Sequence, residues 1–388
     1  MVAGEPSGDL LAARILAGLQ AQAPGLAARG IGGPRMQAQG FDPWHPMHAL
    51  TVFGYVDALK RLPSLLATYR DVRRRWLAEP PAVFVGIDAP DFNLRLETRL
   101  RAAGIPTVHF VGPSIWAWRY ERIHAIRQAV SHMLVLFPFE EELYRKENVP
   151  ATYVGHPLAG AIPMHPDRAA ARARLGLDPQ GRVLAILPGS RSSEIRLLGP
   201  RFLAAAQRLV AKDPALQCVV PMVNAQRQAE FQALLVRHPV PGLRCVTAED
   251  LAGSDAPVAW SVMEACDAAL VASGTATLET ALYKRPMVIS YVLSPWMRRI
   301  MSWKSGQQRP YLPWVGLPNV LLRDFAVPEL LQDDATPEKL ADAAWTALTD
   351  DAQAARVAAR FETLHRDLLR DTPALAARAI LEVAHAAG

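Results

Sequence analysis

Cysteine and long hydrophobic runs are both scarce in this sequence. Among its 388 residues are three cysteines, Cys218, Cys245 and Cys266, and none forms a CxxC pair. This count and spacing argue against a disulfide framework and a zinc site, and they favour a reducing, cytoplasmic setting. No window of about 18 residues is apolar and free of charge, so we expect no membrane-spanning helix. The first residues, MVAGEPSGDLL, turn polar too early for a secretory signal.

Common nucleotide-binding signatures are absent as well. There is no GxxxxGK[ST], and no GxGxxG follows a strand, which disfavours P-loop hydrolysis and ordinary NAD binding. No zinc finger, RNP pattern or recognition helix points to nucleic acid. No metal-holding DxD pair occurs, because Asp88 and Asp91 are separated by Ala-Pro, so we expect neither a metal nor another cofactor. The net charge of +5 could serve phosphates, an anionic membrane surface or no particular partner.

The composition is that of a globular α/β protein. Hydrophobic residues make up 51% of the chain and charged residues 20%. Short apolar runs such as AVFVG (82–86) and VLAILPG (183–189) alternate with helical patterns along the whole length. This alternation predicts βαβ units and parallel sheets. Because the chain exceeds the roughly 250 to 300 residues of a single core, we expect two domains, each built on one such sheet.

The domain boundary is expected at the Pro-rich segment AIPMHPD, residues 161–167. We predict an N-terminal domain over 1–164, a second domain over 165–350, and helices over 351–388 that pack back on the first domain or on a partner subunit. The segment MVAG resembles the end of a strand. Either translation starts upstream of Met1 or the first strand is unusually short.

The segment FVGIDAPDFN places carboxylates directly after an apolar run. Pro90 keeps Ala89 out of helical geometry, so Asp88 is expected at the carboxyl end of a strand, where open α/β sheets bind ligands. The alternative is structural: Asp91 caps the following helix and Asp88 steadies the turn.

Three turns share a pattern that suits phosphate. GEPSGD (4–9), LPGSRSSE (187–194) and ASGTATLE (272–279) each join a strand to a helix through Gly and Ser or Thr. Such turns present backbone N–H groups at a positive helix end, although any tight βα turn needs small residues. Arg191 adds a forked donor for a diphosphate. Glu279 suits the hydroxyls of a ribose or, alternatively, the helix dipole.

Two further segments combine aromatic or apolar residues with cations. PSIWAWRYERI (113–123) follows a strand, where its tryptophans either contact sugars and acyl chains or simply pack. Residues 52–69 are apolar at three- and four-residue steps, and arginines follow them. This basic amphipathic stretch either rests on an anionic membrane or receives a lipid, or else it is a core-facing helix with a solvated basic end. His156 ends a strand and suits a hydrogen-bonded hinge.

Seven motifs, in order and across nearly the whole chain, carry a family resemblance. AGEPSGD, GIGGPRMQAQG, FVGIDAPDFN, PSIWAWR, LPGSRSSEI, ASGTATLET and GLPN resemble the motif set of the lipid-A-disaccharide synthases. The resemblance implies a GT-B glycosyltransferase with two Rossmann-like sheets facing a cleft. It also implies an inverting transfer from UDP-2,3-diacylglucosamine to 2,3-diacylglucosamine 1-phosphate, which gives the β-1',6-linked lipid A disaccharide 1-phosphate and UDP.

The resemblance assigns roles to residues that the patterns alone leave open. It implies catalytic roles for Asp88 and Arg191, with the UDP-sugar donor held in the second domain and the acylated sugar phosphate acceptor in the first. It also implies a cytoplasmic enzyme, peripheral on the cytoplasmic leaflet of the inner membrane. The donor residues implied are Ser190, Glu194, Ser273, Gly274, Thr275, Glu279 and Asn319. The acceptor and lipid residues implied are Glu5, Ser7, Gly8, Val52, Phe53, Val56, Leu62, Leu65, Leu66, Trp116, Trp118 and Arg119.

Other functions fit parts of the pattern. A different lipid glycosyltransferase, or a UDP-sugar 2-epimerase, would share the second-domain turns, but an epimerase needs no lipid surface. A silent UDP-sugar or lipid-binding protein would tolerate loss of Asp88. The chain also has Gly160 where the family commonly has aspartate after GHP, which weakens any hinge role there. Homo-oligomer formation is left open by the sequence.

Overall fold

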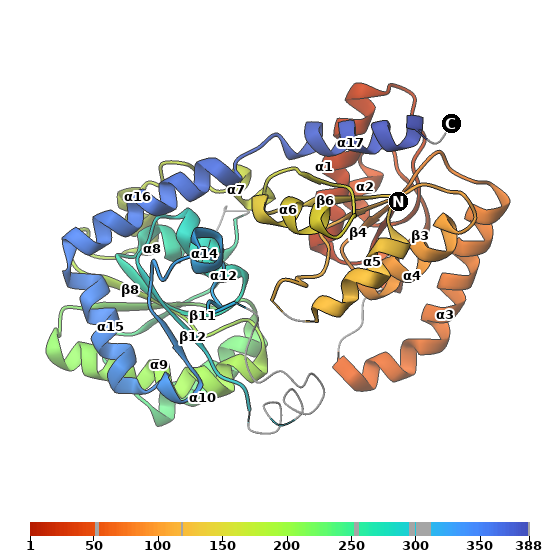
Figure 1. The fold of residues 1–388 in the computed structure, drawn as a ribbon. Coiled ribbons are helices and arrows are strands. Elements are labelled where there is room, and N and C mark those ends of the chain that lie inside the picture. Colours follow the sequence, from red (N-terminus) through yellow and green to blue (C-terminus); the bar gives the residue numbers. More distant parts are fainter. Residues whose placement is uncertain (51–53, 118, 252–255, 295–298, 300–311, 387–388) are drawn as a thin grey trace. The chain divides into compact units, whose positions relative to one another are not determined.

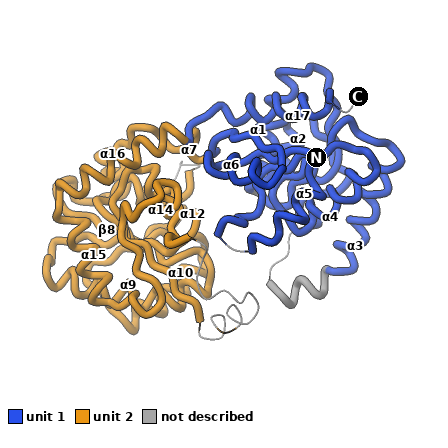
Figure 2. The backbone as a smooth tube through the Cα atoms, viewed as in Figure 1, with its two compact units in different colours: residues 1–157, 368–388 blue, residues 158–367 orange. Residues whose placement is uncertain are grey.

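The chain folds into two compact units. The computed structural model describes all residues except 51–53, 118, 252–255, 295–298, 300–311 and 387–388, and it describes Pro6 and residues 54–61 without their side chains. Unit 1 comprises Met1–Pro157 and Leu368–Gly388, and unit 2 comprises Leu158–Asp367 (Figure 2). The sequence analysis placed the first boundary at 164 and grouped 351–388 together; in the structure the final helices are divided between the two units.

Unit 1 is built on a seven-stranded sheet in the order β3-β2-β1-β4-β5-β6-β7. Every described strand pair in it is parallel. The order in which successive strands are added to the sheet reverses between β1 and β4, which is the switch point where doubly wound sheets bind ligands. The strands are β1 (Val2–Ala3), β2 (Arg29–Gly32), β3 (Asp42–Pro46), β4 (Phe84–Ile87), β5 (Thr107–Phe110), β6 (His132–Val135) and β7 (Ala151–Tyr153).

Helices cover both faces of this sheet, as the continuous burial of its central strands β4 and β5 requires. In β4, Ile87 packs with Ile15 of α1 and Ile380 of α17, whereas Phe84 packs with Trp76 of α3 and Leu100 of α4. Figure 1 shows α17 lying along α1. The helices of unit 1 are α1 (Pro6–Gln22), α2 (Pro34–Gln37), α3 (Gly54–Ala78), α4 (Pro90–Arg101), α5 (Ile123–Ala129), α6 (Pro138–Lys146) and α17 (Thr372–Ala386).

The approach of α17 to α1 depends on Gly18. A Cβ built on Gly18 would lie 2.5 Å from the backbone oxygen of Pro373. Glycine therefore allows the C-terminal helix to lie directly on the first helix. This contact makes the last helix part of the core of unit 1.

Unit 2 contains a six-stranded sheet in the order β10-β9-β8-β11-β12-β13, and its described pairs are all parallel. Its switch point lies between β8 and β11. Two parallel sheets were predicted from the alternating sequence pattern, and that prediction is confirmed. The strands are β8 (Val183–Leu187), β9 (Gln217–Pro221), β10 (Arg244–Val246), β11 (Ala268–Ala272), β12 (Met287–Tyr291) and β13 (Glu329–Leu331).

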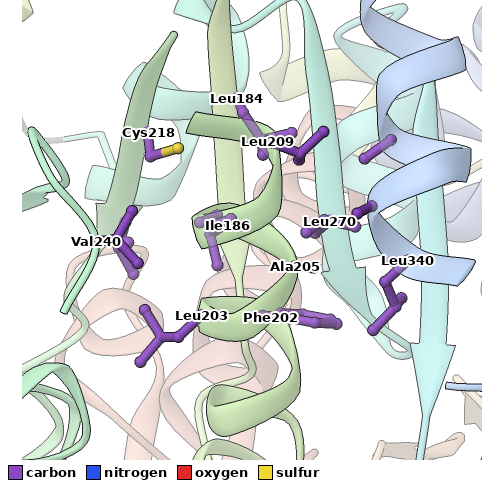
Figure 3. Packing of buried hydrophobic residues seen from close by; sticks show 14 of the residues in the cluster. Leu184, Ile186, Phe202, Leu203, Ala205, Leu209, Cys218, Val240, Leu270 and Leu340 are labelled. Carbon is purple, nitrogen blue, oxygen red and sulfur yellow. The ribbon is translucent and has the colours of Figure 1, made fainter. Parts of the chain in front are cut away.

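The core of unit 2 forms where long helices bury apolar faces on this sheet. Phe202 of α9, Ile186 of β8 and Leu270 of β11 belong to one buried cluster (Figure 3), which Leu340 of α15 joins. The helices are α7 (Pro157–Ala161), α8 (Arg168–Leu175), α9 (Ser192–Lys212), α10 (Ala225–Arg237), α11 (Val258–Ala265), α12 (Thr275–Leu282), α14 (Leu317–Leu322), α15 (Pro337–Thr349) and α16 (Asp351–Leu368). None of the described helices combines the length and the apolar character that crossing a membrane requires.

Candidate active site

Asp88 lies immediately after β4, at the carboxyl end of the strand as predicted. Its backbone N–H donates to the carbonyl of Phe110, the last residue of β5, at 2.8 Å. Asp88 and Ala89 both have left-handed backbone conformations, with φ of 53° and 43°. Such conformations are uncommon for residues other than glycine and are frequent at functional sites. The turn therefore carries strain directly under the carboxylate.

Asp91 does not cap α4, contrary to the structural alternative raised for it. The N-cap position is Ala89, whose side chain has no acceptor, and Asp91 lies in the first helical turn. The Asp91 carboxylate instead accepts from Nη2 of Arg122 at 2.8 Å, with 88% of its side chain exposed.

An apolar groove of about 1010 Å³ adjoins the Asp88 turn in unit 1. Its walls come from α3, from α4 and from the loop that follows Asp88. Leu62, Leu65 and Leu66 of the predicted lipid set line it together with Ala89 and Phe92. The structure thus brings these leucines to the residues that follow Asp88. Val52, Phe53, the side chain of Val56 and Trp118 lie outside the described residues.

The GEPSGD turn lies at the same sheet edge as Asp88, because Ala3 of β1 is in register with Ile87 of β4. Glu5 and Ser7 are exposed there, and Gly8 is buried where α1 passes the sheet. Asp9 performs a role that the sequence analysis missed. Its buried carboxylate accepts from the backbone N–H groups of Gly33, Arg35 and Met36, at 2.8, 3.0 and 3.2 Å. It thereby fixes the start of α2.

Trp116 is held inside an aromatic cluster. Its indole N–H donates to Oε1 of Glu140 at 3.1 Å, and its ring meets Phe139 edge to face at 5.4 Å. Burial raises the pKa of Glu140 to about 7. His156 stacks on Phe137 of the same cluster, and burial lowers its pKa to about 4. Trp116 thus packs in this cluster and stays partly exposed. Arg119 is exposed and has a left-handed backbone, with φ of 59°.

In the LPGSRSSE turn of unit 2, the carboxylate of Glu194 accepts hydrogen bonds from the backbone of the turn itself. Oε2 of Glu194 accepts from the backbone N–H groups of Ser190 and Arg191, at 3.0 and 3.2 Å. A Cβ on Gly189 would lie 2.3 Å from this oxygen, so the turn requires glycine. The sequence analysis expected these N–H groups to face a phosphate. In the structure Glu194 occupies them, while the Arg191 side chain is 81% exposed.

The ASGTATLE turn is open by comparison. Gly274 and Thr275 are exposed at the start of α12, and nothing lies within 4 Å of a Cβ built on Gly274. Oγ of Ser273 donates to the carbonyl of Val315 at 3.4 Å. Since Val271 of β11 is in register with Leu187 of β8, this turn and the LPGSRSSE turn share one sheet edge.

Glu279 and Asn319 are both tied to neighbours. Oε1 of Glu279 accepts from the indole N–H of Trp260 at 2.9 Å, and burial raises the pKa of Glu279. Asn319 is fully buried, donates to Glu329 and exchanges hydrogen bonds with the backbone of Val327. Asn319 therefore organises the loop before β13. Trp260 and Glu329 had no signal in the sequence, because their roles depend on partners distant in the chain.

Comparison with known proteins decides the family. The family model described as lipid-A-disaccharide synthetase matches residues 1–380. The chain belongs to the lipid-A-disaccharide synthase family. It is 80% identical to the synthase of Bordetella pertussis over 387 residues, covering 100% of this chain and 98% of the relative. It is 52% identical to the synthase of Burkholderia thailandensis, covering 99% and 95%. The protein is thus a glycosyltransferase of lipid A disaccharide synthesis that takes a sugar donor and a sugar acceptor.

Solved structures with a similar fold identify the architecture as GT-B. A putative UDP-N-acetylglucosamine 2-epimerase from Listeria monocytogenes superposes with a TM-score of 0.62 at 11% identity, covering 98% of this chain and 93% of that one. WaaG, a glycosyltransferase involved in lipopolysaccharide biosynthesis, gives 0.55 at 15% identity, covering 95% and 94%. These likenesses concern the fold alone. The family match, and not the fold, separates the synthase from an epimerase.

Proposed function

We propose that this synthase binds the acylated acceptor in unit 1 and the UDP-sugar donor in unit 2, and that Asp88 accepts the proton of the attacking hydroxyl. The reaction joins UDP-2,3-diacylglucosamine to 2,3-diacylglucosamine 1-phosphate. The observation that carries the proposal is the groove beside the Asp88 turn. An acceptor whose acyl chains lie along Leu65 and Leu66 would place its sugar close to the residues that precede Ala89.

Inversion requires the acceptor hydroxyl to attack the anomeric carbon from the face opposite the diphosphate. A carboxylate at the end of β4 can take the proton during that attack, in the manner of a general base. The left-handed backbone of Asp88 supports this role, since such conformations persist only where the surrounding structure holds them, and they cluster at active sites.

The charge that develops on UDP requires positive groups in unit 2. Glu194 already fills the N–H groups of the LPGSRSSE turn, so Arg191 acts through its exposed guanidinium. The N-terminus of α12, with Gly274 and Thr275 exposed, supplies the second positive element. Glu279 then faces the ribose, and Trp260 holds its carboxylate in place.

Membrane contact is assigned to α3. Leu62 and Leu66 are 46% and 41% exposed and line the same groove, so they form part of one exposed apolar surface. Arginines follow on the same helix, although Arg74 and Arg75 pair with Asp71. An exposed apolar patch with a basic end suits a peripheral site on the anionic cytoplasmic leaflet of the inner membrane.

The test is product formation by purified protein. The enzyme is incubated with both substrates in detergent and EDTA, and UDP release and disaccharide mass are followed. We expect the disaccharide from the wild type, and a turnover lower by about 10² to 10⁴ from Asp88→Asn with UDP affinity unchanged. Normal turnover by Asp88→Asn would remove this residue from the chemistry. UDP binding without product in the wild type would favour a silent binding protein.

A second variant tests the groove separately. Leu65→Gln should raise the KM for the acceptor about tenfold in detergent, with UDP affinity unchanged, because an amide in the apolar wall disfavours acyl chains. An unchanged KM would move the acceptor site away from the groove and leave the role of Asp88 intact.

A further inference from the structure

Three polar side chains are buried together beneath the Asp88 turn. Asn93, Glu97 and His109 each have no exposed surface. None of them was singled out from the sequence, and none contacts the groove. Polar residues in such a place require a physical reason, since burial of polar groups is unfavourable unless hydrogen bonds compensate it.

Asn93 and Glu97 lie four residues apart on α4 and face β4. A Cβ built on Gly86 would lie 2.2 Å from Oε1 of Glu97 and 3.0 Å from Cβ of Asn93. Glycine at this position of β4 therefore makes room for both side chains. Helix α4 is packed onto the strand through polar residues at the point that leads into Asp88.

His109 attaches this helix to the neighbouring strand. His109 of β5 is in register with Gly86 of β4, and its Nδ1 lies 2.8 Å from Oε1 of Glu97. Two strands and one helix thus meet at a single buried contact. Burial raises the pKa of Glu97, while the neighbouring His109 opposes that rise.

The contact reaches Asp88 through Asn93. Nδ2 of Asn93 donates to the backbone carbonyl of Asp88 at 2.7 Å and to that of Ile87 at 3.4 Å. The N–H of Asp88 is fixed from the other side by the carbonyl of Phe110. Both polar groups of the Asp88 backbone are therefore held by the same small region of unit 1. This explains how a left-handed turn persists without glycine.

The hydrogen bonding within this cluster is incomplete. Within the described part of the chain, Oδ1 of Asn93, Oε2 of Glu97 and Nε2 of His109 find no hydrogen-bond partner. A buried polar atom without a partner destabilises the fold, and apolar replacements of the same shape are often neutral or stabilising. The presence of three such atoms under one turn therefore favours a functional role for these polar side chains over a purely structural one.

We propose that Asn93, Glu97 and His109 are positioning residues that hold the Asp88 turn in its left-handed conformation and thereby direct the Asp88 carboxylate at the acceptor hydroxyl. The inference rests on the proposed role of Asp88. It adds that the direction of the carboxylate is set by three buried side chains of α4 and β5 that do not line the groove.

The first test is Asn93→Leu, which keeps the branched shape of the side chain and removes the donor. We expect kcat to fall about 10- to 100-fold, the size of effect that a small misplacement of a reacting group produces. KM for both substrates, UDP affinity and the melting temperature should stay close to wild type. A kcat within about threefold of wild type would overturn the proposal. Leu96→Ala, a core change on the same helix, is the control: it should lower the melting temperature and leave kcat near wild type.

A double mutant separates positioning from a general structural effect. If Asn93 acts through Asp88, then adding Asn93→Leu to Asp88→Asn should lower turnover by less than about threefold more, because the effects of residues acting as a unit do not multiply. Multiplying losses would overturn the proposal. An Asp88→Asn enzyme with full turnover would refute the base role and this inference together, whereas an impaired Asp88→Asn beside a normal Asn93→Leu would refute this inference alone.

Two further variants address the case in which Asn93→Leu does not fold and the contribution of His109. If Asn93→Leu does not fold, Asn93→Ala removes the same donor without adding volume, and the same fall in kcat is expected. His109→Gln acts one contact further from Asp88, so we expect a smaller fall in kcat, about 3- to 10-fold, again with KM unchanged. A normal kcat in His109→Gln would remove His109 from the set.

Discussion

Arg191 and Glu194 are coupled at the end of β8: the carboxylate of Glu194 accepts from the backbone N–H of Arg191 at 3.2 Å and lies 3.3 Å from its guanidinium. The two residues have opposite charges at the edge where the donor is expected to bind. Glu194 therefore both closes the turn and anchors the arginine beside it. A bound diphosphate would compete with this carboxylate for the same guanidinium.

Arg191→Ala should weaken UDP binding at least tenfold and lower turnover by about 10² or more, since it removes the charge that stabilises the leaving group. Isothermal calorimetry with UDP and a steady-state assay measure the two effects. Arg196→Ala is the matched control, because Arg196 is exposed on the same helix. Normal UDP affinity in Arg191→Ala would exclude the diphosphate role.

Glu279 should distinguish ribose from deoxyribose if it binds the sugar of uridine. Trp260→Phe removes the indole donor that holds Glu279 and leaves a largely buried carboxylate with one hydrogen bond fewer. We expect it to weaken UDP binding about 3- to 10-fold and to reduce the preference for UDP over 2′-deoxy-UDP. Titration of both nucleotides into wild type and variant measures this preference. Equal weakening for the two nucleotides would mean that Glu279 does not contact the 2′-hydroxyl.

The positions at which the strands end could be predicted from the sequence more accurately than the contacts made by the side chains at those ends. Pro90 was sufficient to place Asp88 at the end of β4, because its restriction of the preceding residue is local. The left-handed turn could not be predicted, since it depends on Asn93 and on the carbonyl of Phe110 in the neighbouring strand. Tertiary contacts, and not local propensity, set that geometry.

The same distinction explains the turns of unit 2. The Gly and Ser residues of LPGSRSSE correctly predicted a tight turn between a strand and a helix, but the pattern did not show that Glu194 would fill its N–H groups. Likewise, Asn319 in GLPN was expected to face the substrate. It is instead buried against Glu329, ten residues further along the chain. A motif identifies residues of importance without showing which partner each one has.

Membrane binding through α3 should depend on its exposed leucines. Leu62→Glu combined with Leu66→Glu should release the protein from anionic vesicles in a flotation assay, because it adds two negative charges to the patch and removes apolar surface. Leu77→Glu is the control: Leu77 is also exposed on α3 but does not line the groove. If the double variant still floats with the vesicles, another surface binds the membrane.

Folding of unit 1 should become less favourable as the pH rises through the range set by Glu140. Its pKa is about 7 in the folded protein against an ordinary value of 4.5, because the carboxyl is buried beside Trp116. Between these two values the folded protein binds more protons than the unfolded chain, so the free energy of unfolding falls with increasing pH, by on the order of 3 kcal/mol. At pH above 7 this loss is complete.

Glu140→Gln removes the titrating group, so the free energy of unfolding of the variant relative to wild type should increase from pH 4.5 to pH 7 and then level off. Denaturant titrations of both proteins across this range measure the difference. His156, whose lowered pKa acts in the opposite direction, contributes equally to both proteins and cancels. Glu142→Gln, an exposed change on the same helix, should give a flat difference. Parallel curves for Glu140→Gln and wild type would mean that the carboxyl of Glu140 is ionised in the folded protein and stabilised by its hydrogen bonds to Trp116 and Phe137.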